Sequence, residues 1–127
     1  MEEAIRYSQE RIQWGKPIAG HQLVAAKLAT MATEIDAARL LALRAITMID
    51  EGKRCDKECA MAKWYATELA VRATRDAVQI HGGNGVTKAF VVERLAREAI
   101  IAPIPDGTTE IQKLLISRSL TGIQAFI

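Results

Sequence analysis

Apolar residues recur along most of this chain at alternating intervals of three and four positions, the spacing that places them on one face of an α-helix. The longest run begins near His21 and ends at residues 51–53, where glycine follows the last apolar position. Its apolar positions are Val24, Leu28, Met31, Ile35, Ala38, Ala42, Ala45 and Ile49. About thirty residues at 1.5 Å each predict a helix of roughly 45 Å. A second stripe of Leu40, Leu43 and Ile46 predicts that this helix packs on two sides.

Helices are also predicted before and after this run. The first extends from the start to about Trp14 and ends at a Gly-Lys-Pro stop signal, with Arg11 in its last turn. No N-cap precedes it, so we expect the chain to begin inside a helical element. The third helix begins at Asp56 as its cap and ends at the glycine-rich residues 81–85. Its predicted seam is Cys59, Ala62, Ala66, Leu69, Ala73, Ala77 and Ile80.

Two shorter helices complete the pattern. Thr87 is a plausible cap for the fourth, which Pro103 and Pro105 should stop. Thr108 should cap the last helix. Because no segment alternates with period two, we predict an all-α fold, an antiparallel up-and-down four-helix bundle with an additional short helix.

Composition agrees with one helical domain and excludes several function classes. The 127 residues suffice for a single core, and half are hydrophobic while only 5% are aromatic. The net charge of +2 comes from interleaved acids and bases, so we expect no nucleic-acid partner. No apolar run is long enough for a membrane span and no signal-peptide layout is present, so we expect a cytoplasmic protein.

The two cysteines, Cys55 and Cys59, have the spacing of residues that share a helix face. They could form part of a metal site, but no second pair completes one and both histidines are distant in sequence. We therefore predict no metal site, with Cys59 as a small core residue and Cys55 as a loop residue in a reducing compartment.

The turn at Pro105-Asp106-Gly107 has two interpretations. Pro, Asp and Gly are ordinary turn residues, and turn chemistry alone would account for them. A carboxylate held rigidly on a turn could also accept a proton at the mouth of a site.

Three stretches together resemble the C-terminal domain of the acyl-CoA dehydrogenases, flavoproteins that oxidise acyl-CoA thioesters. They are Arg-Ile-Gln-Trp-Gly-Lys-Pro-Ile at 11–18 with His-Gln at 21–22, Gln-Ile-His-Gly-Gly-Asn-Gly at 79–85, and Asp-Gly-Thr-Thr-Glu-Ile-Gln at 106–112. Residues 120–126 are also similar to the ending of glutaryl-CoA dehydrogenases. The resemblance covers residues 1–127, and it implies an N-terminal helical domain and a middle β-barrel that lie outside this chain.

The resemblance implies FAD as the cofactor. Arg11 would pair with its pyrophosphate, which a guanidinium suits, and Trp14 would pack on the flavin nucleotide where the family usually has Phe. In the family the glycine-rich turn approaches the FAD of a neighbouring subunit, whereas His81 is expected to be a packing residue. The other implied cofactor-binding positions are Gln13, Gln22, Gln79, Ile80, Gly82, Gly83, Thr108 and Glu110.

The resemblance also identifies Asp106 as the catalytic base, with Gly107 at a substrate-binding position. The family's usual sequence here is Tyr-Glu-Gly-Thr, in which Glu removes the α-proton while hydride leaves the β-carbon for the flavin. Asp is one methylene shorter, a difference of roughly 1.5 Å. A misplacement near 1 Å can lower a rate on the order of 100-fold.

Three explanations for the aspartate stay open. In the first, the backbone shifts so that Asp106 acts on an unusual substrate, similar to relatives that use cyclic thioesters and to the related nitroalkane oxidases. In the second, the base lies on an upstream part of the first helix, and in the third the domain serves only assembly. We favour the first, in which the full enzyme dehydrogenates an acyl-CoA, passes electrons to an acceptor and self-associates through its helices as a dimer or tetramer. The alternatives are a non-catalytic oligomerisation module and a flavin oxidase that uses Asp.

Overall fold

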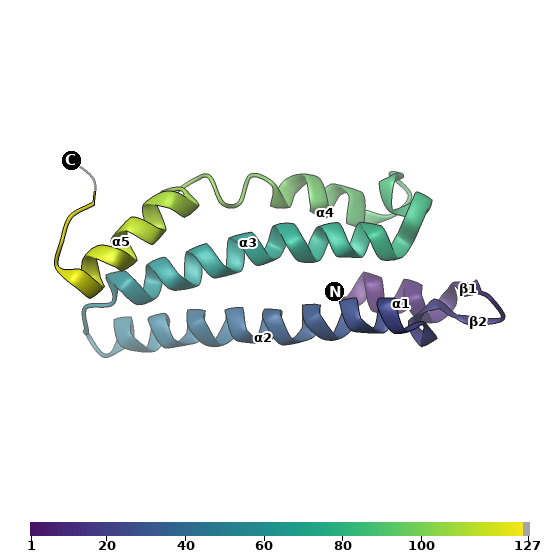
Figure 1. Cartoon of the computed structure of the whole chain (residues 1–127), viewed down its shortest axis with the longest axis horizontal. Helices are drawn as coiled ribbons and strands as arrows, with labels where there is room; N and C mark the ends of the chain where they lie inside the picture. The colour runs from purple at the N-terminus through teal and green to yellow at the C-terminus, as the bar shows by residue number, and fades with distance from the viewer. Residues whose placement is uncertain (126–127) are drawn as a thin grey trace.

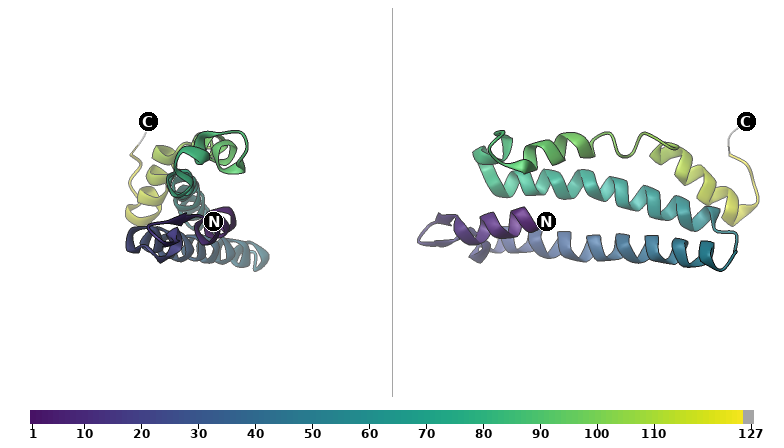
Figure 2. Two further views of the ribbon diagram at one scale, coloured as in Figure 1. Left: turned by 90° about the vertical axis from the view of Figure 1, so that its right-hand side faces the viewer. Right: turned by 180° about the vertical axis from the view of Figure 1, so that it is seen from behind.

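The structure, a computed structural model, describes residues 1–125 and is an elongated set of antiparallel helices (Figure 1). The two longest helices, α2 (Gln22–Asp50) and α3 (Asp56–His81), lie side by side along the whole molecule. The shorter helices α1 (Glu2–Glu10) and α4 (Val91–Ala99) lie at one end, and α5 (Thr109–Thr121) lies along α3 at the other. The all-α prediction is confirmed, with the four-helix section confined to the α1 and α4 end (Figures 1 and 2).

Small residues and ion pairs set the contact between α2 and α3. Met31, Ala38 and Ala45 are buried at intervals of seven on α2, and alanine lets two helix backbones approach closely. Three ion pairs cross the same interface: Lys27–Asp76, Glu34–Arg72 (3.1 Å) and Arg44–Glu58 (3.1 Å). The residue numbers rise along α2 while those of their partners fall along α3, so all three ion pairs are consistent with one antiparallel packing of the two helices.

Glu58 is a buried carboxyl in this interface. Its burial by itself raises the pKa of Glu58. A hydrogen bond from its own backbone N–H and the cations of Lys57 and Arg44 outweigh that effect, so its pKa lies below the usual range. The Glu58 carboxylate therefore stays ionised and paired at neutral pH.

The second apolar stripe on α2 has no partner among residues 1–125. Leu40, Leu43 and Ile46 are 61%, 57% and 53% exposed. The expectation that α2 packs on two sides is therefore wrong for this chain alone, because the only long helix beside α2 covers the other face.

The main apolar core lies at the α1 end. It consists of Ala4, Ile18, Met31, Ala77, Ile80 and Val92. Beside it the His81 ring stacks on Tyr7 with centroids 4.2 Å apart and meets Phe90 edge-on. The Nδ1 atom of His81 lies 2.8 Å from the Ala77 carbonyl oxygen. His81 is 3% exposed, in agreement with a packing role.

The first helix is shorter than predicted. It ends at Glu10, and β1 (Ile12–Gln13) pairs antiparallel with β2 (Lys16–Pro17) in a hairpin. The two loop residues, Trp14 and Gly15, have φ values of +54° and +77°, as a type I′ hairpin turn requires. The predicted Gly-Lys-Pro stop signal therefore lies in the hairpin and does not end the helix, and Arg11 is extended rather than in a helical turn.

Several predicted caps are also corrected. Asp56 is the first residue of α3, and the cap position belongs to Cys55. Thr87 ends the short 3₁₀ segment η2 (Gly82–Val86), donating its hydroxyl to the Asn84 carbonyl (2.8 Å), and α4 starts only after Phe90. Thr108 does hold the cap position of α5, but its side chain makes no cap hydrogen bond.

The cysteine assignment was reversed. Cys55 is buried, whereas Cys59 is exposed one turn later on α3. The periodic pattern placed Cys59 on the same helix face as the buried alanines. Cys55 precedes α3 with a non-helical backbone, and it is this cysteine that is buried.

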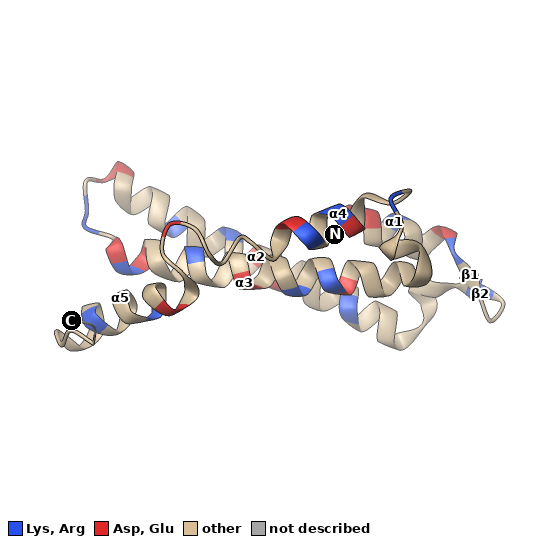
Figure 3. Cartoon of the chain, turned by 90° about the horizontal axis from the view of Figure 1, so that it is seen from above, with Lys and Arg blue, Asp and Glu red and all other residues tan. Residues whose placement is uncertain are grey.

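Acidic and basic residues are interspersed along the helices in the view of Figure 3. Within residues 1–125, none of the helices combines the length and apolarity that crossing a membrane needs. The stretch similar to glutaryl-CoA dehydrogenases extends to Phe126, which lies outside the described residues.

Gly85 is expected to be intolerant of a side chain. A Cβ there would lie 2.5 Å from the Val78 carbonyl oxygen and 2.9 Å from the His81 Cβ. Gly85→Ala should therefore lower the free energy of unfolding by about 1–3 kcal/mol, measured by urea denaturation. Gly83→Ala is the matched control, since no atom lies within 4 Å of its Cβ position, and should change stability by less than about 0.5 kcal/mol. Equal losses in the two variants would contradict the close contact.

Candidate functional site

The loop that carries Asp106 is held by two side chains from different helices. Lys63 of α3 donates from Nζ to the carbonyl oxygens of Pro103 (2.9 Å) and Gly107 (2.7 Å). Gln112 of α5 donates from Nε2 to the carbonyl oxygens of Asp106 (3.1 Å) and Gly107 (3.0 Å). Gln112 is only 7% exposed, so its rotamer is restricted by packing. The loop is thus clamped through its backbone, and we call Lys63 and Gln112 the loop clamp.

The turn itself has an unusual backbone. Asp106 has a φ of +56° and Gly107 a φ of +90°. Asp and Asn tolerate the left-handed region better than other residues with side chains, and Gly adopts it freely. A Cβ on Gly107 would also lie 2.8 Å from the Gln112 Nε2 atom. The conformation therefore accounts for both residue types.

The side chain of Asp106 is available for chemistry. The residue is exposed, and within residues 1–125 no hydrogen bond or ion pair engages its carboxylate. The loop clamp binds only carbonyl oxygens, so it positions the residue without neutralising it. A rigid backbone with a free carboxylate is what a general base requires.

The first turn of α5 continues from this loop. Thr109 is buried and donates its hydroxyl to Glu68 on α3 (2.6 Å), which attaches the helix start to the bundle. Glu110 is exposed, and hydrogen bonds from its own backbone N–H and from Thr108 lower its pKa. Glu110 is therefore anionic at neutral pH, which disfavours a phosphate at that position.

A second group of the implied site residues surrounds the hairpin. Trp14 is 93% exposed at its tip, and Gln13 and Gln22 are also exposed. Arg11 is exposed, and within the described residues its guanidinium has no ion pair or hydrogen bond. Its backbone is fixed, because its carbonyl accepts the Ile18 N–H (2.8 Å).

The glycine-rich turn lies at the same end of the molecule (Figure 1). Gly82 and Gly83 are exposed, and a Cβ at either would meet no atom within 4 Å. Asn84 donates to the Tyr7 hydroxyl (2.9 Å), which connects this turn to α1. Gln79 is exposed, whereas Ile80 is 6% exposed and belongs to the apolar core.

The Asp106 loop is a separate surface from the one formed by the hairpin and the glycine-rich turn at residues 82–85, which we call the hairpin end. Lys63 and Gln79 both lie on α3, and their spacing corresponds to roughly 24 Å at 1.5 Å per residue. The hairpin end offers an unpaired guanidinium, an exposed indole ring and open glycine backbone, a donor set that suits an anionic ligand with flat rings. The residues present therefore fit a dinucleotide cofactor there.

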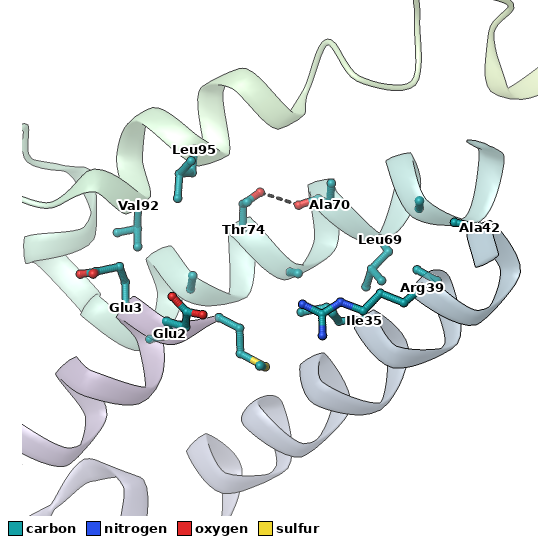
Figure 4. Close-up of a pocket in the computed structure, with 16 residues that line it drawn as sticks. Glu2, Glu3, Ile35, Arg39, Ala42, Leu69, Ala70, Thr74, Val92 and Leu95 are labelled. Carbon is teal, nitrogen blue, oxygen red and sulfur yellow. Dashed lines mark hydrogen bonds between the residues drawn. The ribbon is translucent and has the colours of Figure 1, made fainter. Parts of the chain in front are cut away.

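An apolar groove lies between the helices (Figure 4). Its volume is about 590 Å³, and its walls come from the N-terminal end of α1 and from α2, α3 and α4. Labelled wall residues include Ile35, Arg39, Leu69, Thr74, Val92 and Leu95. None of the implied site residues lines it. Alanines on α3 leave this space open, although in sequence they indicate only close packing.

Sequence reasoning missed both residues of the loop clamp. Lys63 and Gln112 are ordinary polar residues of helices, and each reaches the loop only through the tertiary fold. No group of three or more metal-ligating side chains occurs within residues 1–125.

Comparison with known proteins identifies one family. The family model described as acyl-CoA dehydrogenase, C-terminal domain, matches residues 1–121. An acyl-CoA dehydrogenase from Bacillus subtilis is 48% identical over 96% of this chain and 32% of its own length. A cyclohexane-1-carbonyl-CoA dehydrogenase from Geobacter metallireducens is 38% identical over 94% of this chain and 31% of its own length.

A solved structure agrees in fold. The glutaryl-CoA dehydrogenase from Mycobacterium smegmatis in complex with FADH2 has a TM-score of 0.94 and 29% identity. The match covers 99% of this chain and 33% of that one. This chain therefore spans about a third of the length of the curated relatives it matches.

Proposed function

We propose, because this chain belongs to the acyl-CoA dehydrogenase family, that it supplies the proton-abstracting carboxylate and part of the FAD site for α,β-dehydrogenation of an acyl-CoA thioester. The observation that carries the proposal is the unpaired Asp106 carboxylate on a clamped left-handed turn. The family uses FAD, which when bound accepts the hydride from the β-carbon.

Asp106 would take the α-proton onto a carboxylate oxygen. A carboxylate in water has a pKa too low for this task, and desolvation raises it. Asp106 is exposed in this chain, so its cover must come from bound substrate and from other parts of the enzyme. The loop clamp keeps the residue in place while that cover forms.

The hairpin end would bind the cofactor. Arg11 would pair with the pyrophosphate, and the Trp14 ring would stack against the nucleotide. The open backbone at Gly82 and Gly83 allows a ligand to approach closely. Because Lys63, which holds the Asp106 loop, and Gln79, beside the glycine-rich turn, are roughly 24 Å apart along α3, we expect the two surfaces to serve the FAD molecules of two neighbouring subunits.

A chimaera tests the proposal. This chain replaces the matching third of the Bacillus subtilis acyl-CoA dehydrogenase, with which it shares 48% identity. The chimaera should purify with FAD and should reduce a dye with straight-chain or cyclic acyl-CoA thioesters, whereas the isolated chain should do neither. A folded chimaera without FAD would refute the cofactor role. A chimaera that holds FAD but turns over no thioester would favour an assembly function.

Trp14→Asn separates cofactor binding from folding in the same chimaera. Asn suits the φ of +54° at this turn position, so the free energy of unfolding should stay equal or rise by up to about 1 kcal/mol. Loss of the stacked ring should weaken FAD binding about tenfold, which is 1.4 kcal/mol. Unchanged FAD affinity would place the ring outside the cofactor site.

We further propose self-association through the exposed stripe of Leu40, Leu43 and Ile46, since a row of large apolar residues this open marks an interaction surface. Analytical ultracentrifugation should find dimers or tetramers of the chain, and Leu43→Glu should weaken association by about 10- to 100-fold. Leu23→Glu is the control, because Leu23 is 83% exposed but lies roughly 160° round α2 from Leu43 at 3.6 residues per turn. A monomer at high concentration, or equal effects of the two variants, would contradict the stripe as the interface.

A further inference from the structure

The first turn of α3 brings two thiols together. The Cys55 and Cys59 sulfur atoms are 3.6 Å apart, and the Cys59 N–H donates to the Cys55 carbonyl at 2.9 Å. Cys55 occupies the cap position with a φ of −139° and a ψ of 25°, outside helical values. A disulfide bond is about 2.05 Å long, so closing one requires an approach of roughly 1.5 Å by two side chains that already face each other.

The two thiols differ in access. Cys59 is exposed to solvent, whereas Cys55 is 9% exposed. Burial raises the pKa of the Cys55 thiol, and its contact with Cys59 raises it further. A dissolved oxidant therefore meets Cys59 first, with a protonated and shielded thiol beside it.

We propose that Cys55 and Cys59 form an oxidation site for hydroperoxides, in which Cys59 is attacked and Cys55 resolves the product to an intrahelical disulfide. In the first step the Cys59 sulfur, having lost its proton, attacks the hydroperoxide. An S–O bond forms, the O–O bond breaks, and water or an alcohol leaves with the proton, so that Cys59 becomes a sulfenic acid.

In the second step the Cys55 sulfur attacks the Cys59 sulfur. The S–S bond forms, the S–O bond breaks, and hydroxide leaves as water with the Cys55 proton. The two thiols together lose two electrons, and the hydroperoxide is reduced by the same two. A thiol reductant reverses the bond by exchange.

The site adjoins the loop clamp. Cys59 and Lys63 are four residues apart on α3, which places them on one helix face a single turn apart. Lys63 is the residue that binds the Pro103 and Gly107 carbonyls. A Cys55–Cys59 disulfide would therefore constrain α3 one turn from Lys63, the residue that holds the Asp106 loop.

Peroxide titration of the 127-residue chain tests the proposal. With hydrogen peroxide the free thiols should fall from two per chain to none, the intact mass should drop by two hydrogen atoms, and dithiothreitol should restore both values. The product should run as a monomer on a denaturing gel without reductant. Disulfide-linked dimers, or an over-oxidised Cys59 beside a free Cys55, would overturn the assignment.

Two serine variants separate the roles of the cysteines. Cys55→Ser should accumulate a Cys59 sulfenic acid that dimedone traps, whereas the wild-type chain should be trapped far less because Cys55 consumes it. Cys59→Ser should leave Cys55 at least about tenfold slower to react, since it is buried. If Cys55 alone reacts as fast as the wild-type pair, the exposed thiol is not the point of attack.

Discussion

Replacing Asp106 by Asn in the chimaera is expected to lower the rate of flavin reduction by about 10²- to 10⁴-fold, the contribution of a general base. Asn has the same shape and tolerates the left-handed φ of +56°, so the turn should persist. Gln112 would still donate to the carbonyl of this residue, because that contact involves only the backbone. The loss would therefore report the carboxylate itself, measured by anaerobic stopped-flow absorbance.

Two further variants complete this experiment. Asp36→Asn removes an exposed carboxylate from α2 and should leave the rate unchanged. Asp106→Glu restores the methylene that the family's usual base has, and should raise the rate on substrates for which reach is limiting. Retained turnover in Asp106→Asn would place the base elsewhere, for example on a segment ahead of α1.

Lys63→Met is expected to lower the rate about 100-fold through displacement of the Asp106 loop. Met has similar length but no donor, so the Pro103 and Gly107 carbonyls would lose their shared ammonium. The loop would then be held by Gln112 alone, and a shift near 1 Å is sufficient for a loss of this size. The contacts that we assign to Arg11 and Trp14 should not change, because Lys63 and Gln79 are already roughly 24 Å apart along α3.

Steady-state and exchange measurements identify Lys63 as a positioning residue. We expect kcat to fall while KM stays within a factor of about two, and hydrogen exchange in residues 103–108 to accelerate. Lys113→Met is the matched control, since Lys113 lies over the Trp64 ring and makes no contact with the loop backbone. A reduced rate with unchanged exchange would mean that Lys63 acts by another route.

The loop clamp also bears on the shorter base. Gln112 and Lys63 bind the carbonyls on both sides of the Asp106–Gly107 peptide, so the loop has little freedom to move towards a substrate. If Asp106 is the base, as we propose, the substrate would have to lie closer to it than to the longer Glu. We therefore expect thioesters with a bulky or cyclic acyl group to be better substrates than straight-chain ones.

Much of this protein follows from its sequence alone. The periodic apolar positions correctly predicted the long helices, and the glycines after Asp50 and His81 correctly marked their ends. Three short stretches were sufficient to identify the family, which the family model confirms over residues 1–121. These features are local: a helix repeats every 3.6 residues, and a turn depends on its own few residues.

The remainder was decided by the tertiary structure. The hairpin at residues 12–17 has strands of two residues, too short to produce an alternating pattern. The loop clamp joins Lys63 to Gly107, 44 positions apart in sequence, and nothing near either residue indicates the contact. Burial at Cys55 and exposure along Leu40, Leu43 and Ile46 likewise depend on which neighbours cover a helix. Local periodicity determines which faces can be buried, but only the packing of distant segments determines which faces are.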